Sequence, residues 1–253
     1  MTRVFLAGAG PGDPELLTVK TMRLLQTAEI VLHDSLVSAE ILALAAPTAR
    51  LIDVGKRCGR HSASQDEICA LLVQTALKTT GIVLRLKGGD PMIFGRASEE
   101  MLVLDAHGIF YEVVPGITAA LAAAASLKLS LTQRLVSRAV HFVAGHTADG
   151  GLPDHDFAGL AQAGGTLAVY MGAQTFTGFA AHLVEAGLDP ATPAIAIENA
   201  TRPEERVIHG TVAGLPRALR RHASEGPVLI LAGSALAAEA ALCPNLTEAE
   251  AAA

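Results

Sequence analysis

The residues of this sequence whose types and spacing could do chemistry gather in short loops after apolar runs. The longest such stretch is 85–100, in which Gly88-Gly89-Asp90-Pro91 follows the apolar run at 82–84 and precedes residues 97–107. The apolar run predicts a buried strand and residues 97–107 predict a helix, so the glycines lie in a strand–loop–helix junction. Two glycines let a backbone approach a ligand, because no side chain stands in the way. A tight turn without a ligand is the alternative for this loop alone.

A carboxylate and a run of cations follow two other predicted strands. Asp34 comes after residues 29–33, and the basic run at 55–61 comes after residues 51–54. Ligands of open α/β sheets bind at the carboxyl ends of strands, which favours an anion-binding role for the run. The alternatives are that Asp34 caps a helix starting near Ser38 and that the run is a solvated loop. His61 has no carboxylate or cysteine partner at ligand spacing, so we expect no metal.

Two further loops contain glycine and proline. The first, at 8–14, follows a predicted strand at 4–7 but fails the GxGxxG dinucleotide fingerprint, because Asp13 replaces the third glycine and Pro11 has no N–H. The second, at 114–119, opens an alanine-rich helix. Thr118 there is either a helix cap or, since helix N-termini carry partial positive charge, part of a ligand site.

Taken together and in this order, the loops at 8–14, 55–61 with Gln65, 85–100 and 114–119 resemble those of the tetrapyrrole (corrin/porphyrin) methylase family. The resemblance extends from Val4 to about Ser234. It implies a fold of two α/β domains with the active site in the cleft between them. We expect these domains at 1–116 and 117–243, with a frayed tail at 244–253.

The resemblance also implies a methyl donor, S-adenosyl-L-methionine, which leaves as S-adenosyl-L-homocysteine without help from a metal. Methyl transfer of this kind depends mostly on positioning and on proton removal from the acceptor. By the family pattern Asp34 is the proton acceptor and Lys56 the proton donor, although either could instead orient the acceptor. The donor residues carried over are Pro11, Gly88, Gly89, Asp90, Ile93, Thr118, Ala119, Met171 and Ala200.

Within the family, the Gly-Lys-Arg-x-Gly-x-His…Gln pattern resembles members that methylate carbons 2 and 7 of uroporphyrinogen III to give precorrin-2. That acceptor carries eight carboxylates, which guanidinium groups recognise well. The acceptor residues we expect are Arg57, Arg60, His61, Arg96, Glu99 and Arg134. The alternatives are a later precorrin methyltransferase, diphthine synthase or ribosomal RNA methyltransferase within the family, or a catalytically silent S-adenosylmethionine or tetrapyrrole sensor.

The chain departs from the family pattern at four places. Met92 replaces an aromatic residue, Ala97-Ser98 replace two glycines, residues 128–134 replace a Gly-Ile-Pro-Leu-Thr-His-Arg type of segment, and Ala200 replaces a glycine. The extra methyl of Ala200 is compatible with donor binding if the contact is through the backbone. The other changes loosen the assignment of the acceptor, because they fall in loops expected to contact it.

Composition limits the classes of function. The 253 residues are 51% hydrophobic and 17% charged, with a formal net charge of −6, which argues against a nucleic-acid or anionic-membrane binder. Cys58, Cys69 and Cys243 form no CxxC pair and indicate a reducing compartment. The start of the chain shows no signal-peptide pattern, and the longest uncharged stretch, 113–127, is too short to span a bilayer. We therefore expect a cytoplasmic protein, and by family resemblance a homodimer.

Hydrophobic periodicity predicts the elements that position these residues. The expected strands are 4–7, 29–33, 51–54, 82–86, 111–114, 139–144, 166–170, 194–197, 206–209 and 228–232. The expected helices are 14–27, 64–79 with a Ser64/Glu67 capping box, 97–107, one from 118 onward, 157–162, 176–185 and 212–222. An exposed loop is expected at 146–156.

Overall fold

The computed structural model describes residues 2–55, 64–222 and 224–237. Lys56, Arg57, Arg60, His61, Cys58, Cys243 and the predicted tail at 244–253 lie outside the described residues. The chain forms two compact units, Met1–Ala119 and Ala120–Ala253, and each is described by itself. The domain bounds inferred from sequence remain predictions.

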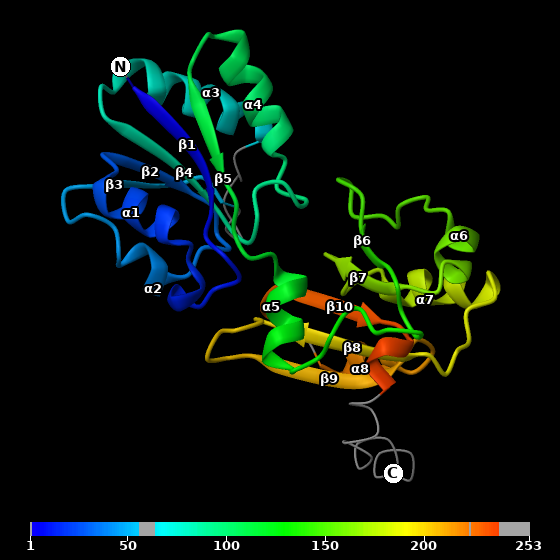
Figure 1. The fold of residues 1–253 in the computed structure, drawn as a ribbon. Helices are drawn as coiled ribbons and strands as arrows, with labels where there is room; N and C mark the ends of the chain where they lie inside the picture. Colours follow the sequence, from blue (N-terminus) through cyan, green and yellow to red (C-terminus); the bar gives the residue numbers. More distant parts are fainter. Residues whose placement is uncertain (1, 56–63, 223, 238–253) are drawn as a thin grey trace. The chain divides into compact units, whose positions relative to one another are not determined.

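The first unit is a parallel sheet of five strands in the order β3-β2-β4-β1-β5 (Figure 1). These strands are β1 (Arg3–Gly8), β2 (Ile30–His33), β3 (Arg50–Asp53), β4 (Ile82–Lys87) and β5 (Tyr111–Val114). All neighbouring pairs run parallel, so their carboxyl ends lie at one edge of the sheet. The described loops that follow β1, β2, β4 and β5 therefore share this edge.

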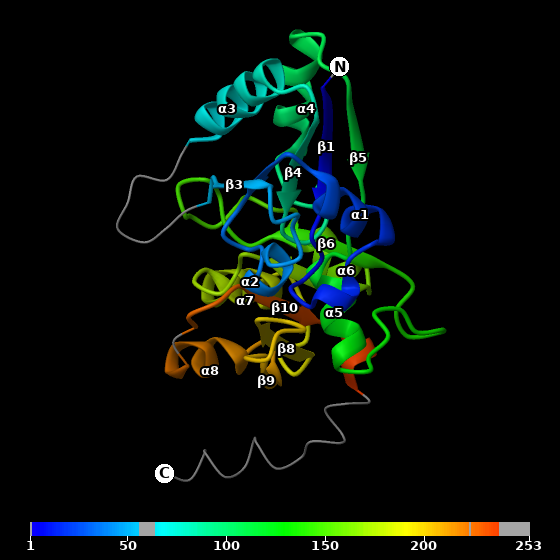
Figure 2. The same ribbon diagram turned by 90° about the vertical axis from the view of Figure 1, so that its left-hand side faces the viewer.

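Helices cover both faces of this sheet. On one face, α1 (Val19–Thr27) and α2 (Ala39–Leu42) pack against residues such as Phe5 and Leu84. On the other face, α3 (Gln65–Lys78) and α4 (Ala97–Ala106) pack against Val4 and Val83, as Figure 2 shows. Since strand side chains alternate between faces, Arg85 and Lys87 point to the α3/α4 side while Leu84 and Leu86 point to the α1/α2 side.

The second unit is a mixed sheet in the order β6-β7-β10-β8-β9. Its strands are β6 (Val140–Ala144), β7 (Thr166–Tyr170), β8 (Pro193–Glu198), β9 (Arg206–Thr211) and β10 (Val228–Ala232). Only the β6–β7 pair is parallel among these neighbours. Helices α6 (Phe157–Gln162), α7 (Phe176–Glu185) and α8 (Leu215–Arg221) cover one face, and α5 (Ala119–Ser126) packs against the other.

All ten predicted strands are present, and two predicted helices begin later than expected. Residues 14–27 do not form one helix, because a 3-10 turn, η1 (Pro14–Leu16), ends at Leu17 in extended conformation before Thr18 caps α1. Val19, the first residue of α1, is 67% exposed. The helix expected at 212–222 begins at Leu215, because β9 continues to Thr211 and the Thr211 hydroxyl accepts a hydrogen bond from the Gly214 amide.

The capping box of α3 is confirmed. The Ser64 hydroxyl accepts from the Glu67 amide at 3.2 Å, and the Glu67 carboxylate accepts from the Ser64 amide at 2.6 Å. These bonds satisfy two amides that the first helical turn leaves without partners. In residues 2–55, 64–222 and 224–237, no helix combines the length and apolar character needed to cross a membrane.

Candidate active site

The loops that follow β4, β1 and β5 contact one another just beyond the carboxyl ends of these strands. The Gly10 amide donates to the Gly89 carbonyl at 3.1 Å, and the Gly89 amide donates to the Gly10 carbonyl at 2.7 Å. A Cβ on Gly8 would lie 2.5 Å from the Gly89 oxygen, and one on Gly116 would lie 2.3 Å from it. Because real Cβ atoms do not approach an oxygen this closely, the contact requires glycine at both positions. The loops are therefore joined backbone to backbone.

Asp90 fixes the same loops through its side chain. One carboxylate oxygen accepts from the Gly116 amide at 2.9 Å, and the other accepts from the Met92 amide at 2.8 Å. Gly89 has a φ of +68°, in the left-handed region that favours glycine. Asp90 thus ties the loop after β4 to the loop after β5.

Asp34 is held at the carboxyl end of β2. Its Oδ1 accepts from the Leu36 amide at 3.0 Å, and its Oδ2 accepts from the Gly88 amide at 3.2 Å. The alternative that Asp34 caps the helix near Ser38 is wrong, because the Ser38 hydroxyl itself caps α2 by accepting from the Ile41 amide. The Asp34 side chain is 24% exposed, so it is oriented by the protein and still reachable from outside.

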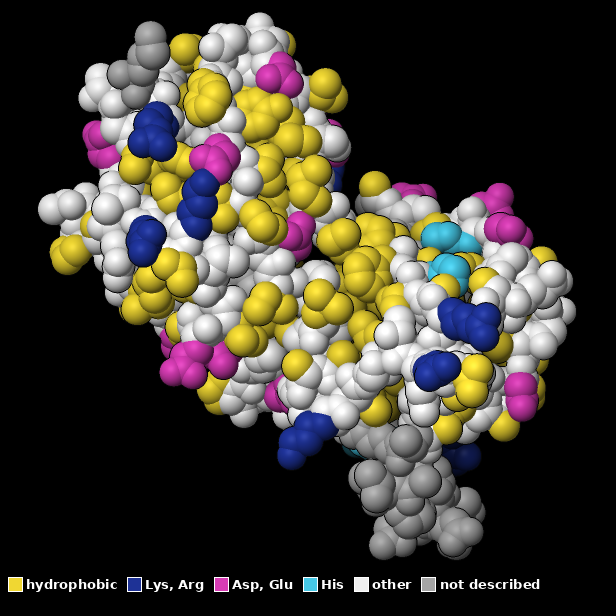
Figure 3. Space-filling view, in the orientation of Figure 1, with side chains coloured by type: hydrophobic (Ala, Val, Ile, Leu, Met, Phe, Trp, Pro, Cys, Tyr) yellow, Lys and Arg dark blue, Asp and Glu magenta, His cyan; other side chains and the backbone are white. Residues whose placement is uncertain are grey.

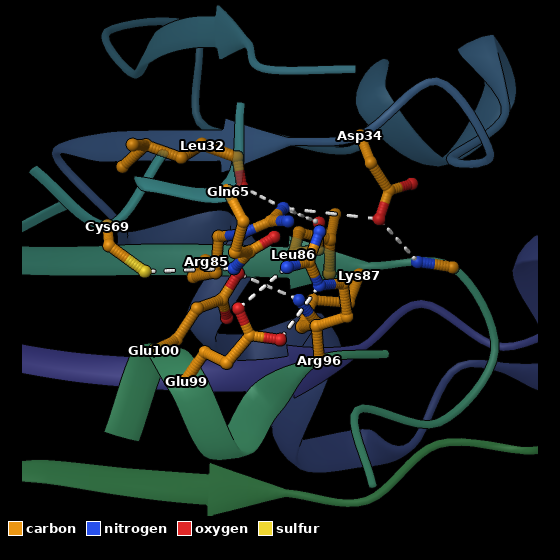
Figure 4. Close-up of polar contacts among 11 residues, drawn as sticks. Leu32, Asp34, Gln65, Cys69, Arg85, Leu86, Lys87, Arg96, Glu99 and Glu100 are labelled. Atoms are coloured by element: carbon orange, nitrogen blue, oxygen red, sulfur yellow. Dashed lines mark hydrogen bonds and ion pairs between the residues drawn. The ribbon is translucent and has the colours of Figure 1, made fainter. Parts of the chain in front are cut away.

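Beneath Asp34 lies a cluster of buried charges that the sequence motifs did not predict (Figure 4). Glu100 Oε1 accepts from Arg85 Nε at 3.0 Å and from Lys87 Nζ at 2.8 Å. Arg85 Nη1 lies 4.0 Å from Asp34 Oδ2. Burial, and then the neighbouring Arg85 charge, lower the pKa of Lys87. The sequence does carry a signal for this cluster. Arg85 and Lys87 stand at alternate positions of a strand that is otherwise apolar, and Glu99 and Glu100 follow in the next helix.

Of the acceptor residues expected in the described part of the chain, Arg96 and Arg134 are exposed and Glu99 is half-buried. Arg96 donates to both carboxylate oxygens of Glu99, at 2.8 and 2.7 Å. The hydrogen bond from Arg96 lowers the pKa of Glu99. Since Glu99 already occupies the guanidinium fork, an acceptor carboxylate would have to share or displace it. Arg134, in the second unit, is exposed on a short turn closed by the Gln133 and Ser137 backbones.

On the face drawn in Figure 3, the described Lys and Arg side chains are scattered among apolar ones. Leu36, Met92 and Phe94 are exposed apolar side chains of the first unit. A Cβ placed on Gly88 would lie only 2.6 Å from the Cβ of Leu36, so these two loops are also in close contact. Pro11 and Ile93 are half-buried, whereas Thr118 is buried. The donor residues expected at this edge thus lie in loops that also carry exposed apolar side chains.

In the second unit, Met171 and Ala200 follow strands whose carboxyl ends lie at the same sheet edge, because β7 and β8 both run antiparallel to β10. Met171 has a φ of +57° and is 44% exposed. Such left-handed residues concentrate at functional sites. The Ala200 side chain is buried in the core with Ile197 and Leu229, which leaves its backbone as the group that a ligand would meet.

Tyr170 and Glu198, at the ends of β7 and β8, hold this edge of the second sheet in place. The Tyr170 hydroxyl accepts from the Ala120 amide at 3.1 Å, which ties the start of α5 to the end of β7. Glu198 accepts from the amides of Glu225 and Gly226 at 2.7 and 2.8 Å and pairs with Arg206. Although burial opposes ionisation, the Gly226 amide, the Arg206 guanidinium and the Glu225 amide together hold the pKa of Glu198 below its usual value.

Each edge, taken by itself, presents groups that suit part of the donor that the sequence implies. At Gly8 and Gly116 a Cβ would collide with the Gly89 carbonyl, so the loops at the first edge pack backbone against backbone. Polar backbone groups and adjacent apolar side chains suit a molecule with a flat base and a polar amino-acid tail. Among the described residues, no group of three or more His, Cys, Asp or Glu side chains could hold a metal ion.

Comparisons with known proteins agree with this arrangement. The family model for tetrapyrrole (corrin/porphyrin) methylases matches residues 3–216. A uroporphyrinogen-III C-methyltransferase of Paracoccus denitrificans is 44% identical over 97% of this chain and 86% of its own length. A siroheme synthase of Methylococcus capsulatus is 47% identical over 91% of this chain, which spans 48% of that longer protein.

A solved structure shows the same fold. The uroporphyrin-III C-methyl transferase of Thermus thermophilus, complexed with S-adenyl homocysteine, matches with a TM-score of 0.80 and 41% identity, covering 93% of this chain and 99% of that one. The family model extends over most of the chain, and the curated relatives exceed 40% identity over nine tenths of it or more. The chain therefore belongs to the tetrapyrrole (corrin/porphyrin) methylase family.

Proposed function

We propose that this chain is an S-adenosyl-L-methionine-dependent uroporphyrinogen-III C-methyltransferase. It methylates carbons 2 and 7 of uroporphyrinogen III in turn, yielding precorrin-2 and two S-adenosyl-L-homocysteines. The observation that carries the proposal is Asp34, a carboxylate oriented by the Gly88 and Leu36 amides at a glycine-lined sheet edge. The relatives named above support the choice of acceptor.

The residues we propose for donor binding are those carried over from the family pattern. In the first unit these are Pro11, Gly88, Gly89, Asp90, Ile93, Thr118 and Ala119, and in the second unit Met171 and Ala200. When bound, the donor supplies an electrophilic methyl group on a sulfonium. The chain's own part is to orient both reactants through backbone groups and to exclude alternative geometries.

Asp34 is the proposed proton acceptor. After methyl transfer to a pyrrole carbon, a proton must leave the acceptor, and a positioned carboxylate collects it. Each oxygen of Asp34 accepts one amide hydrogen bond, and the side chain remains 24% exposed, which supports this role. Lys56 is the proposed proton donor, and Arg57, Arg60, His61, Arg96, Glu99 and Arg134 are proposed to bind the carboxylates of the acceptor.

The proposal extends to the state of the protein. We propose that it is a cytoplasmic homodimer that binds neither nucleic acid nor membranes. The formal net charge of −6 supports the last two points, because it opposes binding to polyanionic surfaces.

The experiment is an anaerobic incubation of the purified protein with uroporphyrinogen III and S-adenosylmethionine, followed by mass spectrometry of the product. We expect two added methyl groups and a precorrin-2 or sirohydrochlorin spectrum. Asp34→Asn should lower kcat by about 100-fold, within the usual range for a general base. A protein that binds S-adenosylhomocysteine but methylates only a different tetrapyrrole would contradict the proposed acceptor.

A further inference from the structure

The buried carboxylate of Glu100 carries an inference that rests on the proposed function and deepens it. Glu100 is fully buried, and its Oε1 is shared by Arg85 and Lys87, which are each 3% exposed. The surrounding core is apolar, with Leu32, Leu72 and Leu104 packed on the same side of the sheet. Well-packed apolar residues serve a core at least as well as buried ion pairs, so stability alone does not call for these charges.

The geometry connects Glu100 to Asp34 through one side chain. Glu100 holds Arg85 by its Nε atom, and the guanidinium is planar, so this contact sets the direction of the remaining nitrogens. Arg85 Nη1 donates to the Leu86 carbonyl at 3.1 Å and lies 4.0 Å from Asp34 Oδ2. Figure 4 shows Arg85 between the two carboxylates. Arg85 therefore faces Asp34 at ion-pair distance without donating a short hydrogen bond to it.

The balance of charges around Arg85 explains why the distance between Arg85 and Asp34 matters. Arg85 and Lys87 are balanced by Glu100 and Asp34, and buried charges must be paired. If Glu100 lost its charge, the nearest remaining carboxylate for Arg85 would be Asp34. The guanidinium would turn toward Asp34 and draw it inward, away from the exposed side where a substrate proton would be taken.

We propose that Glu100 is a positioning residue, which restrains Arg85 and so keeps Asp34 available as the proton acceptor. Lys87 completes the restraint by donating to the same oxygen of Glu100. Its stem lies 3.2 Å from where a Cβ on Gly95 would stand, so it also supports the loop that contains Ile93.

The test is a double-mutant cycle of Glu100→Gln with Asp34→Asn, measured by single-turnover methyl transfer to uroporphyrinogen III. In the wild-type background, Glu100→Gln should lower the transfer rate by about tenfold or more, while the Kd for S-adenosylhomocysteine and the KM for the acceptor change by less than about twofold. In the Asp34→Asn background the same change should have less than about a twofold effect, because residues that act together are not additive.

A matched control and a second variant keep the test decisive. Glu112→Gln removes a carboxylate from the exposed ion pair with Lys20 and should leave the transfer rate unchanged. If Glu100→Gln does not fold, Glu100→Asp keeps the charge but draws the carboxylate back from Arg85 Nε, so it should loosen the restraint and show coupling of the same sign to Asp34→Asn.

The outcomes separate this inference from the proposed function. Equal losses from Glu100→Gln in both backgrounds, or no loss in either, would overturn the positioning role while the enzyme remains active. A wild-type protein that transfers no methyl group to uroporphyrinogen III would overturn the proposed function, and this inference with it.

Discussion

Single residues at the edge of the first sheet serve two different purposes. Glycines at 8 and 116 let their backbone segments touch the Gly89 carbonyl, and side chains such as Asp90 then lock those segments with hydrogen bonds. Charged residues of β4 and α4 form the layer beneath. The loop surface and the charged layer can be tested separately, since they depend on different physical effects.

Gly116→Ala should disrupt the loop surface by contact alone. Its Cβ would lie 2.3 Å from the Gly89 oxygen and 2.8 Å from the Gly8 Cα, so the loops must separate. We expect a loss of about 1–3 kcal/mol in the free energy of unfolding, as for other overpacked sites. Calorimetric titration should also show at least about tenfold weaker S-adenosylhomocysteine binding, which corresponds to about 1.4 kcal/mol.

Gly108→Ala is the matched control for that change. Gly108 has a φ of +62°, and a Cβ added to it would have no heavy atom within 4 Å, so alanine there meets strain but no collision. It should cost about 1 kcal/mol of stability and leave binding unchanged. Equal binding by wild type and Gly116→Ala would show that the close contact is not needed for the site.

Lys87 should make stability depend on pH in the alkaline range. Its pKa in the folded chain is lowered from 10.5 by burial and by Arg85, so between the lowered value and 10.5 the unfolded chain binds more protons. The free energy of unfolding therefore rises with pH in that window. Denaturant unfolding at about pH 7 and about pH 10 should show this rise in wild type and a smaller one in Lys87→Met. Parallel pH dependence in the two proteins would contradict the lowered pKa.

At the scale of elements, the strand ends of the second unit are held by one carboxylate. Glu198 ends β8, pairs with Arg206 of β9, and accepts from two amides just before β10. It therefore joins three strands beside the Asn199-Ala200 turn. Its role is to hold the ends of these strands together at the edge of the sheet where the proposed donor residue Ala200 lies.

Glu198→Gln should destabilise the protein at neutral pH and flatten its acid sensitivity. Loss of hydrogen bonds to a charged group costs about 1.5–3 kcal/mol. Because the folded pKa is below 4.5, the stabilisation is present above 4.5 and disappears as the pH falls through the folded value. Thermal unfolding from about pH 7 down to about pH 3 measures both effects. Glu204→Gln, at an exposed carboxylate, should match wild type throughout.

Helix α3 provides a second prediction at the scale of elements. Ser64→Ala removes the hydroxyl of the capping box and should lower the free energy of unfolding by about 1 kcal/mol, as measured by denaturant titration. Ser126→Ala, at the last residue of α5, makes the same chemical change without removing a cap. It should alter stability by less than about 0.5 kcal/mol. An equal loss in both variants would contradict the capping role.

For the whole molecule, the proposed donor residues are distributed over both compact units, each of which has its own core. A ligand that binds the folded chain raises its stability by mass action. S-adenosylhomocysteine at about 100 times its Kd should therefore add about 2.7 kcal/mol and raise the Tm. Asp90→Ala, which frees the Gly116 and Met92 amides, should reduce this increase at the same concentration. No change in the wild-type Tm would contradict donor binding.

Much of the framework could be predicted from the sequence, because it depends on local patterns. Apolar runs identified all ten strands, and the Ser64/Glu67 spacing identified the capping box. Where local signals competed, the prediction was wrong: Thr18 and Asp13 each cap a separate turn, so residues 14–27 do not form a continuous helix. The apolar runs also indicated correctly that Asp34, Gly88 and Gly89 follow the ends of strands.

Only the tertiary structure decided what those side chains touch. Asp34 and Gly88 are far apart in the chain, and their hydrogen bond exists because β2 pairs with β4. The burial of Arg85, Lys87 and Glu100 follows from the packing of α4 over one face of that sheet, which no local periodicity specifies. Sequence by itself thus determined the elements and the family, through short-range patterns and motif spacing. The contacts that orient the proposed base arise from long-range strand pairing and from burial.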